Sequence, residues 1–164
     1  MNSKKLFIWG FLFMSVIGTL LHFVYEWSGN NSIVRLFAPW NESTWEHMKL
    51  LFFPMLVLVL FLFFKLPEQS PIPAALSIGT LVGLALIPIL FYTYTGVLGF
   101  SVMAIDIAIF YISVLGVFLT GWFLKDNRKL ANRNGLLLTC LVILAILFFI
   151  FSYYPPEIGL FQEP

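Results

Sequence analysis

Charge and cysteine are scarce in this chain of 164 residues, and each shortage excludes a class of protein. Only 10% of the residues are charged, whereas soluble globular domains carry about 25%. So few charges cannot cover the surface of a chain that is 60% hydrophobic, which excludes an ordinary soluble enzyme and intrinsic disorder. The single cysteine, Cys140, excludes a disulfide scaffold. A net charge of +1 gives no reason to expect a nucleic-acid partner.

Long apolar runs, by contrast, are abundant, and the mean hydropathy is +0.96. A hydrocarbon core about 30 Å thick needs about 20 apolar residues for each helical span. Five segments meet this requirement, at residues 6–24, 48–64, 72–92, 100–124 and 136–153. They lack the alternation of apolar and polar residues that is typical of a membrane β-barrel. We therefore predict an all-α integral membrane protein, with one domain that is a bundle of five transmembrane helices.

The positions of lysine and arginine indicate the orientation of these helices, because cytoplasmic loops carry an excess of both. The first run has a basic start like that of a signal peptide, but it is too long and no A-x-A-like cleavage site follows, so we expect it to be retained. With a cytoplasmic N-terminus, only Arg35 and Lys49 fall outside. The seven bases on the cytoplasmic side are then Lys4, Lys5, Lys65, Lys125, Arg128, Lys129 and Arg133. We expect an extracytoplasmic C-terminus.

Most of the unusual polar residues then fall near the outer membrane face. Both histidines and five of the eight acids lie there, namely His22, His47, Glu26, Glu42, Glu46, Glu157 and Glu163. Asp106 is expected about 9 Å below the same surface, at about 1.5 Å per helical residue. An ionisable group inside the bilayer normally faces the bundle interior and has a partner. We therefore expect Asp106 to point inward, toward His22 or Lys49.

The spacing of the acids and histidines predicts a metal site. His22 and Glu26 are spaced i, i+4, as are Glu42 and Glu46, and His47 lies beside the second pair. Imidazole and carboxylate groups from facing helices bind zinc, iron or manganese. We predict one divalent ion held by His22, Glu26, Glu46 and His47. One difficulty is angular: His47 lies about 100° round the helix from Glu46, so both cannot point straight at one centre.

A structural interpretation of residues 41–47 stands beside the metal hypothesis. Ser43 followed three residues later by Glu46 is a capping box at the start of the second helix. Glu46 and Lys49, spaced i, i+3, can form an ordinary helical ion pair. This interpretation leaves Glu42 and His47 unexplained. A Ser–His–Asp arrangement of Ser43, His47 and Asp106 is a further alternative, although no G-x-S-x-G elbow accompanies it.

Two other segments carry packing predictions. Residues 32–38, followed by Pro39, are expected to form a short helix in the outer interface, as an anchor or as a lid over the polar pocket. Ala75, Gly79 and Gly83 are spaced by four, and small residues at that spacing let helix backbones approach closely. They predict either packing within the chain or a homo-oligomer.

Three segments also resemble a known family. Residues 22–28 read HFVYEWS, residues 41–49 read NESTWEHMK and residues 155–161 read PPEIGLF. They resemble an uncharacterised family of small bacterial polytopic membrane proteins with an N-E-S-x-W-E-H-x-K motif, and the resemblance covers essentially the whole chain. It implies a multi-pass protein of the bacterial cytoplasmic membrane, and it implies no activity.

Two functional hypotheses follow for a protein whose main partner is the lipid bilayer. The first is a metal-dependent, hydrolase-like membrane enzyme acting on a lipid-borne or extracytoplasmic substrate, with Glu42 or Asp106 as general acid/base. The second is a non-catalytic binding, transport or accessory subunit, whose polar residues hold a lipid or small molecule at the outer face or fix helix packing. The inner halves of the spans are almost wholly apolar, which argues against a conduction path.

Overall fold

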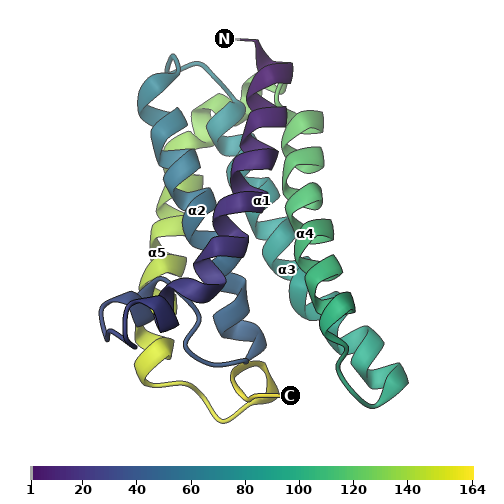
Figure 1. The fold of residues 1–164 in the computed structure, drawn as a ribbon. Coiled ribbons are helices and arrows are strands. Elements are labelled where there is room, and N and C mark those ends of the chain that lie inside the picture. The colour runs from purple at the N-terminus through teal and green to yellow at the C-terminus, as the bar shows by residue number, and fades with distance from the viewer. Residues whose placement is uncertain (1) are drawn as a thin grey trace.

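Five long helices make up the computed structural model, which describes residues 2–164 (Figure 1). They are α1 (Ser3–Trp27), α2 (Thr44–Lys65), α3 (Ile72–Leu98), α4 (Met103–Leu124) and α5 (Asn134–Tyr153). Three short 3-10 helices, η1 (Val34–Leu36), η2 (Arg128–Arg133) and η3 (Gly159–Phe161), lie in the connections and the tail. Residues 2–164 contain no β-strand. The all-helical prediction is confirmed, and all five long helices are long and apolar enough to cross a membrane.

The helix ends follow from local chemistry, and they extend some of the predicted spans. α2 begins four residues before the predicted start, because the Ser43 side chain accepts a hydrogen bond from the backbone N–H of Glu46 at 3.4 Å. α3 continues six residues past its predicted end and stops at Gly99, which adopts a left-handed φ of 79°. Pro54 and Pro88 lie inside α2 and α3 without ending them.

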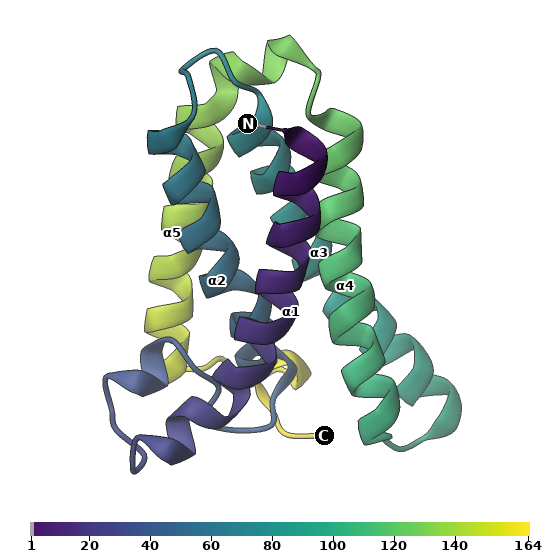
Figure 2. The same ribbon diagram turned by 45° about the horizontal axis from the view of Figure 1, so that its top comes forward.

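α2 lies at the centre of the bundle, where it contacts α1, α3 and α5. Thirteen of its 22 residues are buried, whereas α1 buries only Phe7, Gly10, Met14 and Gly18. α3 and α4 run together as an antiparallel hairpin, and at the end nearest the C-terminus this hairpin diverges from α1 and α2 (Figures 1 and 2). The polar residues of the α1–α2 connection lie at the same end.

The small residues of α3 serve packing within one chain. Ala75, Gly79 and Gly83 are all buried, and the two glycines face the backbone of α4 at Val117 and Ser113. Of the two alternatives, the structure favours packing within the chain, because α4 of the same chain lies against both glycines. Close approach of two backbones is what the four-residue spacing provides.

We expect Gly79→Ala to destabilise the protein by about 1–3 kcal/mol, since overpacking a tight interface forces the backbone to shift. A Cβ atom at position 79 would fall on the backbone carbonyl oxygen of Val117. Gly96 of the same helix is the matched control, because a Cβ there meets nothing within 4 Å. Gly96→Ala should be neutral or slightly stabilising. Unfolding of both variants in a denaturing detergent, followed by circular dichroism, measures the difference, and equal stabilities would contradict the α3–α4 packing.

The charges divide between the two ends of the bundle. The end with the N-terminus, the α2–α3 connection and η2 carries seven basic residues and two acids, Glu68 and Asp126. The other end carries six acids, both histidines, Arg35 and Lys49.

The connection at that end contains η1 in place of the helix predicted over residues 32–38. Its first turn is fixed by the side chain of Asn31, which accepts a hydrogen bond from the backbone N–H of Ile33 at 2.8 Å.

Candidate metal centre

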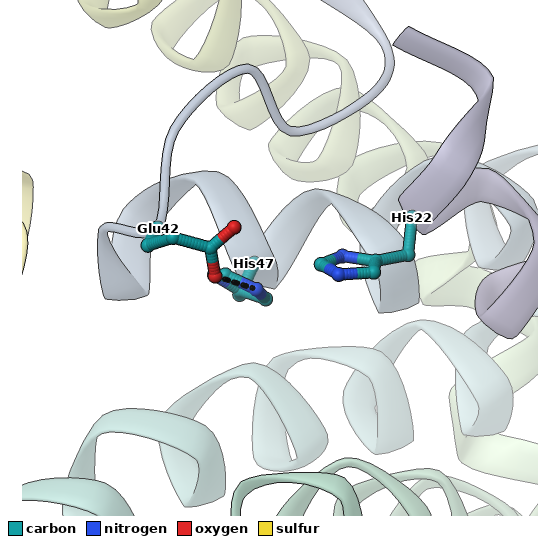
Figure 3. Close-up of side chains that lie close together, drawn as sticks. All are labelled: His22, Glu42 and His47. Atoms are coloured by element: carbon teal, nitrogen blue, oxygen red, sulfur yellow. Dashed lines mark ion pairs between the residues drawn. The ribbon is translucent and has the colours of Figure 1, made fainter. Parts of the chain in front are cut away.

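Three side chains from two helices and one loop converge at the acidic end of the bundle (Figure 3). His22 lies near the end of α1, Glu42 lies in the loop before α2, and His47 lies in the first turn of α2. One ligand atom of each lies within 4.8 Å of the other two. The two imidazole rings are 5.3 Å apart and tilted by 36°. Both histidines are half-buried, and Glu42 is exposed.

The hydrogen bonds of His47 fix which of its ring nitrogens is free. Nδ1 lies 3.1 Å from the backbone oxygen of Ser43, which can only accept a hydrogen bond, so Nδ1 carries the proton. In a neutral ring the lone pair then resides on Nε2. Nε2 lies 3.4 Å from Oε2 of Glu42. Two acceptors facing each other need a cation between them, which is either a proton on His47 or a metal ion.

His22 supplies a second free nitrogen. Its Nδ1 is buried and has no hydrogen-bond partner within residues 2–164. Most buried polar side-chain atoms have a partner, so an unpaired one calls for a specific explanation. A metal-binding imidazole whose other nitrogen donates to a backbone carbonyl, as His47 does to Ser43, is a common arrangement in metal sites.

A cavity of about 110 Å³ lies beside these groups. Its lining residues are His22, Phe23, Tyr25, Glu26, Pro39, Trp40, Asn41 and Glu42. Glu26 is thus close to the centre, one helical turn after His22, although it does not belong to the group of three converging ligand atoms. It is exposed and free to approach an ion or a bound water.

Glu46 lies apart from this group, as the angular difficulty in the sequence suggested. Its carboxylate accepts a hydrogen bond from Lys49 Nζ at 2.5 Å, and the Lys49 side chain has no exposed surface. Lys49 also donates to Ser152 Oγ at 2.5 Å and to the backbone oxygen of Arg35 at 2.8 Å. All three of its donors are therefore satisfied inside the protein. The structure favours the ion-pair interpretation for Glu46.

Arg35 extends this buried cluster to the surface. Its guanidinium donates to the backbone oxygen of Ser152 at 2.6 Å and stacks 3.7 Å above the ring of Trp40. These contacts tie the α1–α2 connection to the end of α5. Sequence reasoning missed Ser152, whose only signal is that it is the single serine in the apolar second half of α5.

Asp106 lies in the α3–α4 hairpin, in the first turn of α4. Its partner is the hydroxyl of Tyr94, which also accepts a hydrogen bond from the backbone N–H of Val102 at 3.0 Å. Neither of the expected partners takes this place: Lys49 is bonded to Glu46, Ser152 and Arg35, and no hydrogen bond joins His22 to Asp106 within residues 2–164. The Ser–His–Asp arrangement is not assembled either, because the hydroxyl of Ser43 donates to Asn41 at 2.8 Å.

Two imidazoles and one carboxylate form a donor set that zinc uses in catalytic sites, with a fourth position open to water or substrate. Ligand atoms of a tetrahedral zinc lie about 3.4 Å apart, given Zn–N distances of about 2.0–2.1 Å. The three atoms here are spread over at most 4.8 Å. One contact in the group, between His47 Nε2 and Glu42 Oε2, already has this spacing at 3.4 Å.

Comparison with known proteins gives one match. The model of a family of unknown function, DUF6512, matches residues 1–164, which confirms the resemblance to an uncharacterised family. No curated protein matches the chain. No solved structure matches it either.

Proposed function

We propose that this chain, which belongs to the DUF6512 family of unknown function, is a membrane protein that binds one divalent metal ion through His22, Glu42 and His47. Zinc suits the donor set best, and iron and manganese are the other metals that such ligands take. The chemistry of the centre is hydrolase-like, directed at an ester or phosphoester. The five apolar helices support a multi-pass membrane location.

The observation that carries this proposal is the His47–Glu42 contact. The proton on Nδ1 leaves the lone pair of Nε2 facing a carboxylate oxygen at 3.4 Å, with a second, unpartnered imidazole nitrogen nearby in His22. A divalent ion relieves the repulsion between these groups and gives each a partner. The surrounding acids favour the approach of a cation, since six acidic residues but only Arg35 and Lys49 lie at this end.

The distribution of basic residues supports an orientation for the bundle. Seven of the nine lie at the end opposite the metal centre, and basic residues favour the cytoplasmic side. The centre then faces the extracytoplasmic side, together with the C-terminus. The family resemblance favours the cytoplasmic membrane of a bacterium.

The residues around the centre suit hydrolysis. A bound ion of this kind lowers the pKa of a coordinated water to about 7 and polarises a substrate oxygen. Glu26, on the cavity wall, would serve as the general base that takes a proton from such a water. The Ser43 carbonyl holds His47 in the correct tautomer. Asp106, bonded to Tyr94 in the α3–α4 hairpin, fixes that hairpin instead of acting as an acid/base group.

One observation favours a second candidate, a non-catalytic ion-binding or small-ligand subunit. The cavity of about 110 Å³ holds only a small group, and the nearby Glu46–Lys49 cluster is fully satisfied without a ligand. In this case the ion would tie α1 to α2 and have no substrate.

Metal analysis of the purified protein tests the proposal. With a histidine-free affinity tag, we expect about one zinc, iron or manganese ion per chain, and less than a tenth of that in His47→Ala. Glu157→Gln, which removes an exposed acid in the tail at the same end, should keep the metal. A folded wild-type protein without metal, both as purified and after incubation with zinc, would overturn the proposal.

A further inference from the structure

The depth of the metal centre limits where its substrate can come from. His22 is five residues before the end of α1, about 8 Å along the helix axis, and His47 is three residues after the start of α2. Trp27 ends α1, Trp40 lines the cavity beside the centre, and tryptophan favours the membrane interface. The centre therefore lies at the level of lipid head groups, between the water and the hydrocarbon core.

The cavity limits the size of what enters. A water molecule occupies about 30 Å³ in the liquid, so a cavity of about 110 Å³ accommodates a phosphate or an ester group. The long chains of a lipid would lie outside this cavity. The class of substrate then depends on whether water or lipid lies beside the centre.

The contact between α1 and α4 ends short of the level of the centre. The hydroxyls of Thr19 and Tyr111 are 3.0 Å apart and join the two helices. Beyond this contact, toward the centre, the helices diverge (Figures 1 and 2). Side chains four residues apart lie on the same face of a helix. Toward the centre, the residue one turn from Thr19 on α1 is Phe23, and the residue one turn from Tyr111 on α4 is Ile107.

The side chains on these two faces are apolar and exposed. On α4, Ile107 is 52% exposed and Met103, one turn further, is 78% exposed. On α1, Phe23 and Trp27 are 41% and 68% exposed, and their rings stack at 5.7 Å. In a membrane-spanning bundle such surfaces contact acyl chains. Phe23 also packs edge-on against His22 at 5.1 Å, so the apolar route ends at the metal ligands.

Resting on the metal centre proposed above, we infer that its substrate is a membrane phospholipid that stays in the bilayer while its head-group phosphate reaches the ion between α1 and α4. The lipid's acyl chains lie against Phe23, Trp27, Ile107 and Met103. A free phosphoester from the water is disfavoured, because it has no acyl chains to cover these exposed apolar side chains.

Pulsed electron paramagnetic resonance with Cu²⁺ as the probe ion tests this route, since Cu²⁺ binds imidazole strongly. The chain has only two histidines, so imidazole nitrogen couplings report occupancy of this centre alone. In nanodiscs of phosphatidylcholine and phosphatidylglycerol, we expect the same ion to show both nitrogen couplings and a phosphorus coupling. In a phosphorus-free maltoside detergent containing millimolar glycerol phosphate, we expect the nitrogen couplings without the phosphorus coupling.

Two variants sharpen the result. Phe23→Ser should weaken the phosphorus coupling and keep the nitrogen couplings, whereas Val16→Ser, at an exposed position elsewhere on α1, should change neither. Nitrogen couplings without phosphorus in nanodiscs would overturn the lipid inference and leave the metal centre standing. An equal phosphorus coupling from glycerol phosphate in detergent would overturn the bilayer route. Absence of nitrogen couplings from the folded protein would overturn the metal centre itself.

Discussion

Lys49→Met is expected to lower the free energy of unfolding by about 3–5 kcal/mol, because removing one partner of a buried ion pair leaves the other charge uncompensated. Methionine keeps much of the apolar stem of lysine and removes the ammonium group. Glu46, which is 2% exposed, then loses the donor at 2.5 Å that neutralises it. Ser152 and the carbonyl of Arg35 lose a donor as well.

A second substitution separates this effect from a general intolerance of the position. Glu46→Leu combined with Lys49→Met replaces both charges by apolar groups of similar volume, and such a replacement is often neutral or stabilising. We expect the double variant to recover most of the lost stability. Lys65→Met, at the exposed end of the same helix, should change stability by no more than about 0.5 kcal/mol. Unfolding in denaturing detergent, followed by circular dichroism, measures all three variants. Equal stabilities of Lys49→Met and Lys65→Met would contradict the buried ion pair.

The buried cluster also positions the candidate metal centre. Lys49 and Arg35 tie the α1–α2 connection to Ser152 near the end of α5. Glu42 lies in that connection, and His47 lies in the first turn of α2. An exposed loop held only by its own turns would leave the carboxylate of Glu42 far from the ring most of the time. Lys49→Met is therefore expected to weaken metal binding as well as stability.

The fold was predictable because each membrane-spanning helix needs about 20 apolar residues, and runs of this length are visible in the sequence. Each predicted span overlaps one helix, and the differences lie at the ends, where local hydrogen bonds decide. Ser43 starts α2 earlier than the apolar run alone indicates, and Gly99 ends α3 later. The role of Gly79 and Gly83 was not predictable, since their spacing fits close packing against any helix. Only the neighbouring α4 backbone shows that the partner lies in the same chain.

The candidate site was predictable in its location and only partly in its membership. The predicted spans and their orientation placed His22 and His47 near the same membrane face, and the 100° step between adjacent residues already separated His47 from Glu46. Glu46 instead forms an ion pair with Lys49, one turn along the same helix. Asp106 accepts a hydrogen bond from Tyr94, twelve residues earlier in the chain, because the α3–α4 turn brings them together. Such pairings depend on helix rotation and tertiary contact, which periodicity alone does not give.

Substituting either histidine by alanine is expected to lower the affinity for zinc by at least about 100-fold, because even outer-shell partners of metal ligands are worth about 10–100-fold. His22 and His47 contribute two of the three converging ligand atoms. Glu26→Gln should lower the affinity less than tenfold, since Glu26 lies on the cavity wall outside that group. Competition of the detergent-solubilised protein with a chromophoric zinc chelator measures each affinity. Equal affinities of His47→Ala and Glu26→Gln would contradict the ligand assignment.

The pH dependence of this centre distinguishes a metal ion from a simple ion pair, because the two have opposite signs. A metal ligand must be a neutral imidazole, so zinc affinity should fall as the pH is lowered from 8 to 6. An ion pair between His47 and Glu42 needs the protonated ring, so that contact should strengthen over the same interval and weaken as the pH rises again. The pair alone is worth at most about 1 kcal/mol, since Glu42 is 69% exposed. With zinc present, the free energy of unfolding should therefore rise from pH 6 to pH 8 in the wild type and stay flat in His47→Ala. A wild-type stability that falls from pH 6 to pH 8 even with zinc present would show that the cation between His47 and Glu42 is a proton.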